Sequence, residues 1–280
     1  MMAESSKFSR VKSYAGRRTM RVSDKTLETT ARWNKFLIGV ADVFIFLGRL
    51  LRNMLSRGFE FYEFFKQCFY IGNKSLGLVS VTGIIVGLVL TIQSRPVLVD
   101  FGAESMLPGM VAISIIREMG PVITALICAG KIGSSMGAEL GSMRVTEQID
   151  AMEVSSTNPI KYLIVPRVLA AMLMLPLLTI YADALGILGS WIGANIKGDM
   201  SFVLFTSHAF ASVDFSDLIP AIIKTFFFGL VIGLVGCYKG FNAGRGTESV
   251  GKAANSAVVM ASLLVIVVDL VAVQLTDLLK

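Results

Sequence analysis

Residues 110–130 read MVAISIIREMGPVITALICAG, an apolar stretch with two adjacent charged residues, Arg117 and Glu118, near its centre. The hydrocarbon core of a bilayer is about 30 Å thick, and a helix needs about 20 residues to cross it. A charged side chain at the centre of such a helix costs about 2.5–3.5 kcal/mol, so this pair must face protein, water or each other. The stretch therefore predicts a membrane-spanning helix that carries a polar spot.

This polar spot has two interpretations. In the functional one, Arg117 and Glu118 line a substrate cavity or belong to a hinge. Pro121 follows three residues on and removes a backbone donor, which favours a kink or a local opening of the helix. In the structural interpretation, the two charges belong to ion pairs that lock helices together. The sequence leaves both open.

The composition of the whole chain supports a membrane protein. Of its 280 residues, 54% are hydrophobic and only 16% are charged, whereas soluble domains carry about 25% charged residues. So few charges could not cover the surface of a soluble globule of this size. We therefore expect an integral membrane protein rather than a soluble enzyme.

Hydropathy predicts an all-α fold with five spans. Two glycines of the first span, Gly83 and Gly87, have the GxxxG spacing that permits close contact between helices in a membrane. The third span is long enough to tilt or to protrude. The predicted spans cover about 75–95, 106–130, 162–194, 218–238 and 255–276.

The chain before the first span divides into three parts. Residues 1–35 carry the whole net charge of +6 and predict a disordered cytoplasmic tail, with a plastid transit peptide or nucleic-acid binding as alternatives. Residues 36–57 gather their polar side chains on one side of a helix, which favours an amphipathic helix in the membrane interface over a first span. Aromatic residues up to 74 predict an elbow into a permease domain, residues 75–280.

The basic residues of the predicted loops indicate the topology. The loops 131–161 and 239–252 each carry three Lys or Arg, whereas the loops 96–105 and 195–217 carry only Lys197. Lys and Arg concentrate in cytoplasmic loops. The N-terminus and the two basic loops are therefore predicted to face the cytoplasm.

Two further acids lie inside predicted spans. Asp269 interrupts the fifth span and Asp183 the third. A lone acid within a bilayer needs a partner or a wet cavity. Arg117 is a candidate partner for Asp269, and for each acid a structural pair and a substrate role remain open.

The basic loop after the second span predicts a short exposed helix at about 146–156. Thr146 is placed to cap it, and Glu147 and Asp150 suit its first turn. Asn158-Pro159 then marks the end of the helix. A short transverse helix of this kind suits docking into a groove on a soluble partner, and a solvated connector is the alternative.

Other motifs carry no chemistry of their own. Residues 246–253, GTESVGKA, have the GxxxxGK spacing of a P-loop but lack the following Ser or Thr and a preceding strand, so we expect a turn and no nucleotide site. The three cysteines are far apart and the one histidine, His208, has no cluster around it, so neither a metal site nor a catalytic set is predicted.

Three blocks of sequence make the chain recognisable. They read IREMGPVITALICAGKIGSSMGAELGSMRVTEQIDAMEV, NPIKYLIVPRVLA and CYKGFNAGRGTESVGKAANSAVV. In this order they resemble the MlaE/YrbE family, the permease subunits of ABC transporters that work with MCE proteins. The resemblance covers about residues 60–275. The basic tail of about 30 residues is longer than the family pattern.

The resemblance implies a fold, a function and partners. The fold would be an interfacial helix plus five spans, assembled as a homodimer in a bacterial inner membrane with the N-terminus in the cytoplasm. The function would be phospholipid transport between the inner and outer membranes, which maintains outer-membrane lipid asymmetry. The partners would be a separate ATPase that binds ATP-Mg, an MCE-domain protein, and an accessory STAS-type subunit. This chain would bind no cofactor and no nucleic acid.

The resemblance also implies roles for particular residues. Glu118 of the REMGP block would lie near a lipid cavity between two subunits, and Asp269 matches the acid of the last span. Together with Arg117 and Pro121, these residues are the candidates for substrate binding or gating. The short helix would couple to the ATPase through Glu147, Gln148, Asp150, Ala151 and Met152.

A second function from a different class remains open at this stage. A stand-alone secondary transporter or channel would use Glu118, Asp269 and Asp183 as a proton or ion relay. Such a protein would need no ATPase, which separates it from an ABC permease.

Overall fold

The computed structural model describes residues 41–43, 45–54, 59–196 and 198–279. The chain divides into two compact units, residues 1–51 and 52–280. The predicted tail, residues 1–35, lies outside the described residues. Residues 41–43 and 45–54 are helical, as expected for the segment 36–57. Its location in the membrane interface stays a prediction.

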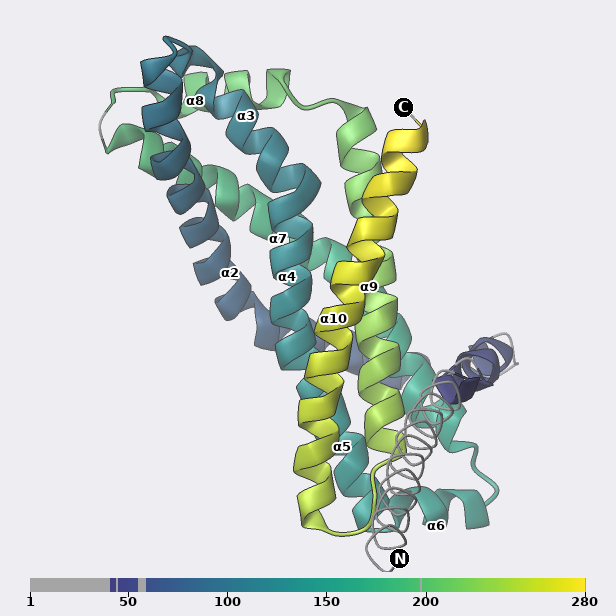
Figure 1. Ribbon diagram of the computed structural model, residues 1–280. Helices are drawn as coiled ribbons and strands as arrows, with labels where there is room; N and C mark the ends of the chain where they lie inside the picture. Colours follow the sequence, from purple (N-terminus) through teal and green to yellow (C-terminus); the bar gives the residue numbers. More distant parts are fainter. Residues whose placement is uncertain (1–40, 44, 55–58, 197, 280) are drawn as a thin grey trace, which may run out of the picture. The chain divides into compact units, whose positions relative to one another are not determined.

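The described part of the second unit is built of helices joined by short turns, with no strand, and contains five helical segments long and apolar enough to cross a membrane (Figure 1). All five predicted spans are confirmed. They are Phe61–Asp100, Glu104–Val145, Ile160–Asn195, Phe215–Phe241 and Thr247–Leu278. In the labels of Figure 1, the first is α2 (Phe61–Asp100), the third contains α7 (Val165–Asn195), the fourth is α9 (Phe215–Phe241) and the fifth is α10 (Thr247–Leu279).

The second span is a chain of short helical pieces. Three α-helical pieces, α3 (Leu107–Ser114), α4 (Gly120–Cys128) and α5 (Ser134–Val145), are joined by π-helical turns at Ile115–Met119 and Ala129–Gly133. The first turn contains Arg117 and Glu118 and stands directly before Gly120-Pro121. A π-helical turn widens the helix locally and often marks a functional site. The local opening expected near Pro121 is therefore present as this turn.

Several predicted boundaries differ from the structure. The stretch predicted as an elbow is continuous with the first span, because α2 already begins at Phe61. The second span runs on to Val145, so the glycines of the predicted loop 131–161 at 133, 137 and 141 lie mainly within α5 and the turn before it. The predicted loop 195–217 contains a further helix, α8 (Phe202–Ala211), which the Ser201 side chain caps. Apolar content alone did not mark these helix ends, because polar residues continue the same helices beyond the predicted spans.

The two ends of the second unit differ. At one end lie α6 (Gln148–Val154) and the short connection between α9 and α10; at the other lie α8 and the end of α10 (Figure 1). We call these the α6 end and the α8 end. Both basic loops of the predicted topology, 131–161 and 239–252, reach the α6 end. Their assignment to the cytoplasm stays a prediction.

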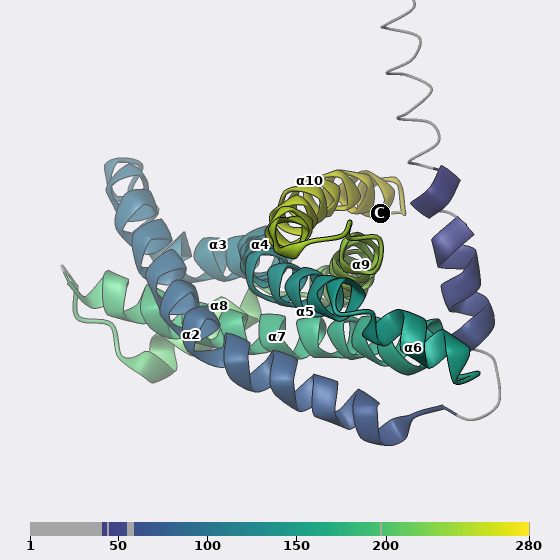
Figure 2. The same cartoon turned by 90° about the horizontal axis from the view of Figure 1, so that it is seen from below.

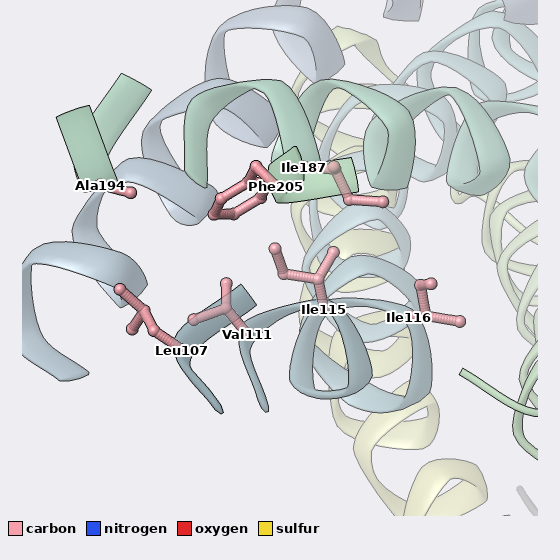
Figure 3. Packing of buried hydrophobic residues seen from close by; sticks show 7 residues of the cluster. All are labelled: Leu107, Val111, Ile115, Ile116, Ile187, Ala194 and Phe205. Atoms are coloured by element: carbon pink, nitrogen blue, oxygen red, sulfur yellow. The ribbon is translucent and has the colours of Figure 1, made fainter. Parts of the chain in front are cut away.

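Near the α8 end, an apolar cluster fixes the first half of the second span. Ile115 and Val111 are almost completely buried and face Phe205 of α8 and Ile187 of α7 (Figure 3). The cluster comprises Leu107, Val111, Ile115, Ile116, Ile187, Ala194 and Phe205. Ile115 and Ile116 are the first two residues of the π-helical turn. Their packing therefore also fixes the backbone that carries Arg117 and Glu118.

The GxxxG spacing of the first span marks a close helix contact, as predicted. A Cβ atom at Gly87 would overlap the carbonyl oxygen of Gly186 in α7, and one at Gly189 would overlap that of Ile84. The Ser190 hydroxyl donates to the Gly87 carbonyl at 3.2 Å across the same contact, and it shares its proton with the Gly186 carbonyl of its own helix at 2.8 Å. Small residues let backbones approach in this way, which is a main source of helix association in membranes. We call this contact the α2–α7 seam.

Candidate functional site

A buried lysine organises the charged residues of the site. Lys224, on α9, is 5% exposed, and its ammonium group donates to Glu118 Oε2 at 2.9 Å and to Asp269 Oδ1 at 3.0 Å. The three residues come from the second, fourth and fifth spans. Lys224 lies in the half of α9 nearer the α8 end, and the two carboxylates meet it at that level. We call Glu118, Lys224 and Asp269 the charge cluster.

The physical chemistry of the charge cluster explains why it can exist within a membrane. An unpaired charge in an apolar medium is costly, so intramembrane charges pair with one another or line a wet cavity. Lys224 has two carboxylate partners and is almost fully enclosed, whereas the Glu118 side chain is 42% exposed. Lys224 is therefore the buried centre of the cluster, and Glu118 is the member that remains accessible.

Arg117 belongs to a neighbouring pair. Its Nε atom lies 3.7 Å from Asp217 Oδ1, at the start of α9. The expectation that Arg117 pairs with Asp269 is wrong, because Lys224 occupies that position. The adjacent residues Arg117 and Glu118 thus reach different charged partners on one helix, since successive residues of a helix project in different directions.

Two hollows adjoin the charge cluster. The first is small, about 20 Å³, and partly open, and it is lined by charged and polar side chains that include Arg117, Glu118, Asp217 and Lys224. The second is a groove of about 470 Å³, also partly open, between α9 and α10, which lie side by side in Figures 1 and 2. Its lining is largely apolar: Ser216, Pro220, Ile223, Lys224, Phe227, Val268, Val271, Ala272, Leu275 and Thr276.

The two hollows share one stretch of wall. Both are bordered by Ser216, Pro220, Lys224, Ala272 and Thr276. A single ligand with a charged part and a long apolar part would therefore place the first against the charge cluster and the second in the groove. We call the larger hollow the α9–α10 groove.

The remaining predicted acid lies apart from the charge cluster. The Asp183 carboxyl group is buried against the backbone of Gly120, and its Oδ1 atom has no hydrogen-bond partner among the described residues. Pro121 is buried next to it. The structure thus joins Glu118 and Asp269 but leaves Asp183 outside their hydrogen-bonded set.

The short helix before the third span exists but begins differently from the prediction. Helix α6 covers Gln148–Val154, and the residue before it is Glu147, in a left-handed conformation with φ of 59°. The expected cap by Thr146 is wrong, because its hydroxyl donates back to the Ser142 carbonyl at 2.9 Å. Thr146 therefore caps the C-terminal end of α5, which stops at Val145, and the chain turns sharply at Glu147.

The contacts of α6 separate an anchoring side from a free side. Ile149 is fully buried, and Asp150 accepts a hydrogen bond from Arg144 of α5. Val154 is 87% exposed. A shallow hollow beside it is lined by Ala151, Met152, Ser155, Thr157 and Tyr162. Of the predicted coupling residues, Asp150 thus pairs within this chain, whereas Ala151 and Met152 face the hollow.

The P-loop-like stretch does not have P-loop geometry. Gly246 has a φ of +98° and makes the turn, and residues 247–253 form the first turns of α10. Lys252 Nζ lies 2.8 Å from Oε1 of Glu248, one helical turn earlier. The element before the turn is the helix α9, whereas a P-loop follows a strand. The expected turn is confirmed for Gly246, but Gly251 lies inside the helix.

Sequence reasoning missed Lys224 and Asp217. A signal for Lys224 was present, because it is a charged residue inside the predicted span 218–238, as Asp269 is inside the fifth. The argument applied to Asp269, that an intramembrane charge needs a partner, applies equally to Lys224. Two opposite charges in separate spans could have been paired on that ground.

A helical bundle with five segments that could cross a membrane, a buried charge cluster and an adjoining apolar groove is the architecture of a multi-pass membrane protein. The family model described as Permease MlaE matches residues 64–275. The chain therefore belongs to the MlaE permease family, as the sequence blocks indicated.

Several similar proteins are named as permease proteins of transport systems. A probable ABC transporter permease protein of Rickettsia prowazekii is 36% identical over 82% of this chain and 88% of its own length. One from Synechocystis is 34% identical over 83% of this chain and 85% of its own length. The intermembrane phospholipid transport system permease protein MlaE of Haemophilus influenzae is 36% identical over 74% of this chain and 79% of its own length.

Proposed function

We propose that this chain is the membrane subunit of an ATP-driven transporter that moves phospholipids between the inner and outer membranes and so maintains outer-membrane lipid asymmetry. The observation that carries the proposal is the position of the charge cluster at the wall of the α9–α10 groove. A phospholipid has a charged headgroup joined to long acyl chains, and this site offers matching surfaces for both parts. The name of the Haemophilus influenzae relative supports the same substrate class.

The proposed mechanism is alternating access without covalent chemistry. Acyl chains would lie along the apolar side chains of the α9–α10 groove, while Glu118 and Arg117 would face the headgroup or gate the cavity. The π-helical turn next to Pro121 gives the second span a point at which it can bend. A ligand that competes for Lys224 would loosen the link between three spans and so favour a different packing of them.

Energy for transport would come from a separate ATPase that binds ATP-Mg. Helix α6 is suited to receive its motion, since it is anchored by Ile149 and exposes Val154 beside a hollow. The coupling residues proposed earlier keep this assignment: Glu147, Gln148, Asp150, Ala151 and Met152. Because Asp150 pairs with Arg144, a substitution there would also disturb α6 itself.

The assembly we propose is a homodimer in a bacterial inner membrane, with the N-terminus and the α6 end in the cytoplasm. Two copies would enclose the lipid path that one copy leaves open along α9 and α10. An MCE-domain protein would meet the α8 end on the periplasmic side. A STAS-type subunit would join on the cytoplasmic side together with the ATPase.

The charge cluster gives the first test. In Lys224→Met, two carboxylates lose their buried cation, so we expect at least a tenfold loss of ATP-dependent phospholipid transfer from proteoliposomes that contain the whole complex. The triple variant Lys224→Met, Glu118→Gln, Asp269→Asn removes the excess charge and should recover a normal unfolding midpoint but not transport. Lys252→Met, on an exposed lysine of α10, is the matched control. Full transport by the triple variant would contradict the proposal.

Co-purification gives the second test and distinguishes an ABC permease from a stand-alone secondary transporter. The chain purified from native membranes should carry an ATPase and bound phospholipid, identified by mass spectrometry. Charge reversal at Glu147 should release the ATPase, whereas the same change at the exposed Glu248 of α10 should not. A secondary transporter using its intramembrane acids would instead move solute in the absence of any nucleotide hydrolase.

A further inference from the structure

A second pocket lies between α2 and the junction of α4 with α5. None of its lining residues belongs to the charge cluster. Figure 1 shows the beginning of α2 passing behind this junction, and Tyr70 of α2 and Ser135 of α5 join the two by a hydrogen bond of 3.3 Å. The pocket is small, about 20 Å³, and is partly open. Its lining is mostly polar or charged: Gln67, Tyr70, Ile71, Lys74, Ser75, Lys131, Ile132, Ser135, Met136 and Glu139. We call it the α2–α5 pocket.

The α2–α5 pocket carries an excess of positive charge. Lys74 lies over the Tyr70 ring at 3.7 Å from its centroid, and neither Lys74 nor Lys131 forms an ion pair with any residue that the structure describes. The acid in the lining, Glu139, is already neutralised by Arg167 at 2.7 Å. The two lysines are thus available to an anion.

A buried hydroxyl group in the lining also lacks a partner. The Ser75 side chain is fully buried, and its Oγ atom has no hydrogen-bond partner among the described residues. Hydroxyl groups inside membrane helices commonly bond to the carbonyl four residues earlier. Ser80, Thr82 and Thr91 of the same helix do so, but Ser75 does not. An unsatisfied buried hydroxyl is unfavourable, and a ligand oxygen in the pocket would accept its hydrogen bond.

The level of the pocket in the membrane indicates the source of the anion. Lys74 stands immediately before the first apolar span, and Lys131 immediately after the apolar part of the second. Both lysines therefore lie at the boundary between hydrocarbon and headgroups, where lysine side chains extend toward lipid phosphates. From Lys74, the exposed residues Leu78, Val81 and Ile85 continue as a stripe on one face of α2, at spacings of four, three and four residues.

We propose that the α2–α5 pocket binds the phosphate of a phospholipid from the leaflet at the α6 end, held by Lys74, Lys131 and the Ser75 hydroxyl. The acyl chains lie along the apolar stripe of α2. The unpaired lysines select an anionic headgroup. This site does not depend on the proposed transport function, because none of its lining residues borders the charge cluster or the α9–α10 groove.

The test uses the full chain, delipidated in detergent and titrated with dioleoylphosphatidylglycerol, with the bound lipid counted by native mass spectrometry. The double variant Lys74→Gln, Lys131→Gln should bind about 30-fold more weakly at this site, since a basic residue near the membrane surface contributes about 1 kcal/mol. Ser75→Ala should weaken binding less. Lys66→Gln is the matched control, because Lys66 is an exposed lysine of α2 that pairs with Glu63 and lies outside the pocket.

Two further titrations identify the ligand. Inorganic phosphate should fail to compete with the lipid at millimolar concentration, and dioleoylglycerol, which has no phosphate, should bind equally weakly to the wild-type protein and the double variant. Competition by inorganic phosphate would show that free phosphate is the ligand and overturn the lipid assignment. Equal losses in Lys66→Gln and in the double variant, with unchanged unfolding midpoints, would overturn the site altogether.

Discussion

The α2–α7 seam and the α9–α10 groove are both formed by long apolar helices, but different groups fill the space between the backbones. In the seam, glycines bring carbonyl groups so close that a methyl group at Gly87 or Gly189 would overlap the opposite backbone. Along the groove, large side chains such as Phe227 and Leu275 border a hollow of about 470 Å³.

The difference shows how a membrane protein can be rigid on one side and adaptable on the other. Lipid tails are as apolar as leucine, so helices in a bilayer gain little from burying apolar side chains and associate through close packing and hydrogen bonds. The seam uses both. Along the groove, larger side chains keep α9 and α10 apart, and the two helices are linked there by the hydrogen-bonded Lys224–Asp269 pair. Substitutions at the seam should therefore affect stability, and substitutions at the groove should affect transport.

The largest effect should come from a methyl group in the seam. Gly87→Ala forces the backbones of α2 and α7 apart, because the new Cβ overlaps the Gly186 carbonyl. Overpacking typically costs about 1–3 kcal/mol, so we expect the unfolding midpoint in detergent to fall by about 5 °C or more. The matched control is Gly77→Ala on the same helix, where a Cβ meets nothing within 4 Å. Equal midpoints for the two variants would remove the distinction between seam and groove.

A smaller effect, on transport instead of stability, should follow from filling the groove. Ala272→Trp places a large side chain between α9 and α10, next to the charge cluster. We expect a severalfold decrease in phospholipid transfer with an unfolding midpoint close to that of the wild type, since the hollow offers room for the ring. The control Leu270→Trp changes an exposed residue at nearly the same depth of α10 outside the groove lining. A transport loss of the same size in Leu270→Trp would contradict a role of the groove.

The sequence predicts features that lie within one helix better than contacts between helices. The span count follows from apolar runs and the seam from a GxxxG spacing, both local features of one helix. Gly189 and Gly193 of α7 have the same GxxxG spacing and also lie against α2, but a spacing within one helix does not state which other helix it contacts, so the partner of Gly87 was not inferred. The ends of α2 and α5 were missed because polar residues continue these helices after the apolar run stops.

The sequence predicted the two acids of the charge cluster but not the lysine that pairs with them. Glu118 and Asp269 were singled out because each is costly inside a membrane, but which cation meets them depends on how three spans pack. Arg117 was the nearest basic residue in the sequence, yet helix geometry directs it toward Asp217. Likewise, the capping rule favoured Thr146, while the real start of α6 is set by the turn at Glu147, which residue type alone does not reveal.

The smallest predicted effect isolates the hydrogen bond of the seam from its close packing. Ser190→Ala removes the hydroxyl that donates to the Gly87 carbonyl, but it leaves the glycine contact intact. Hydrogen bonds between membrane helices contribute on average about 0.6 kcal/mol, so the unfolding midpoint should fall by about 1–2 °C. Thr179→Ser keeps a buried hydroxyl that bonds only within α7 and serves as the control. A loss as large as that of Gly87→Ala would mean that the hydrogen bond, and not the close approach of the backbones, holds α2 against α7.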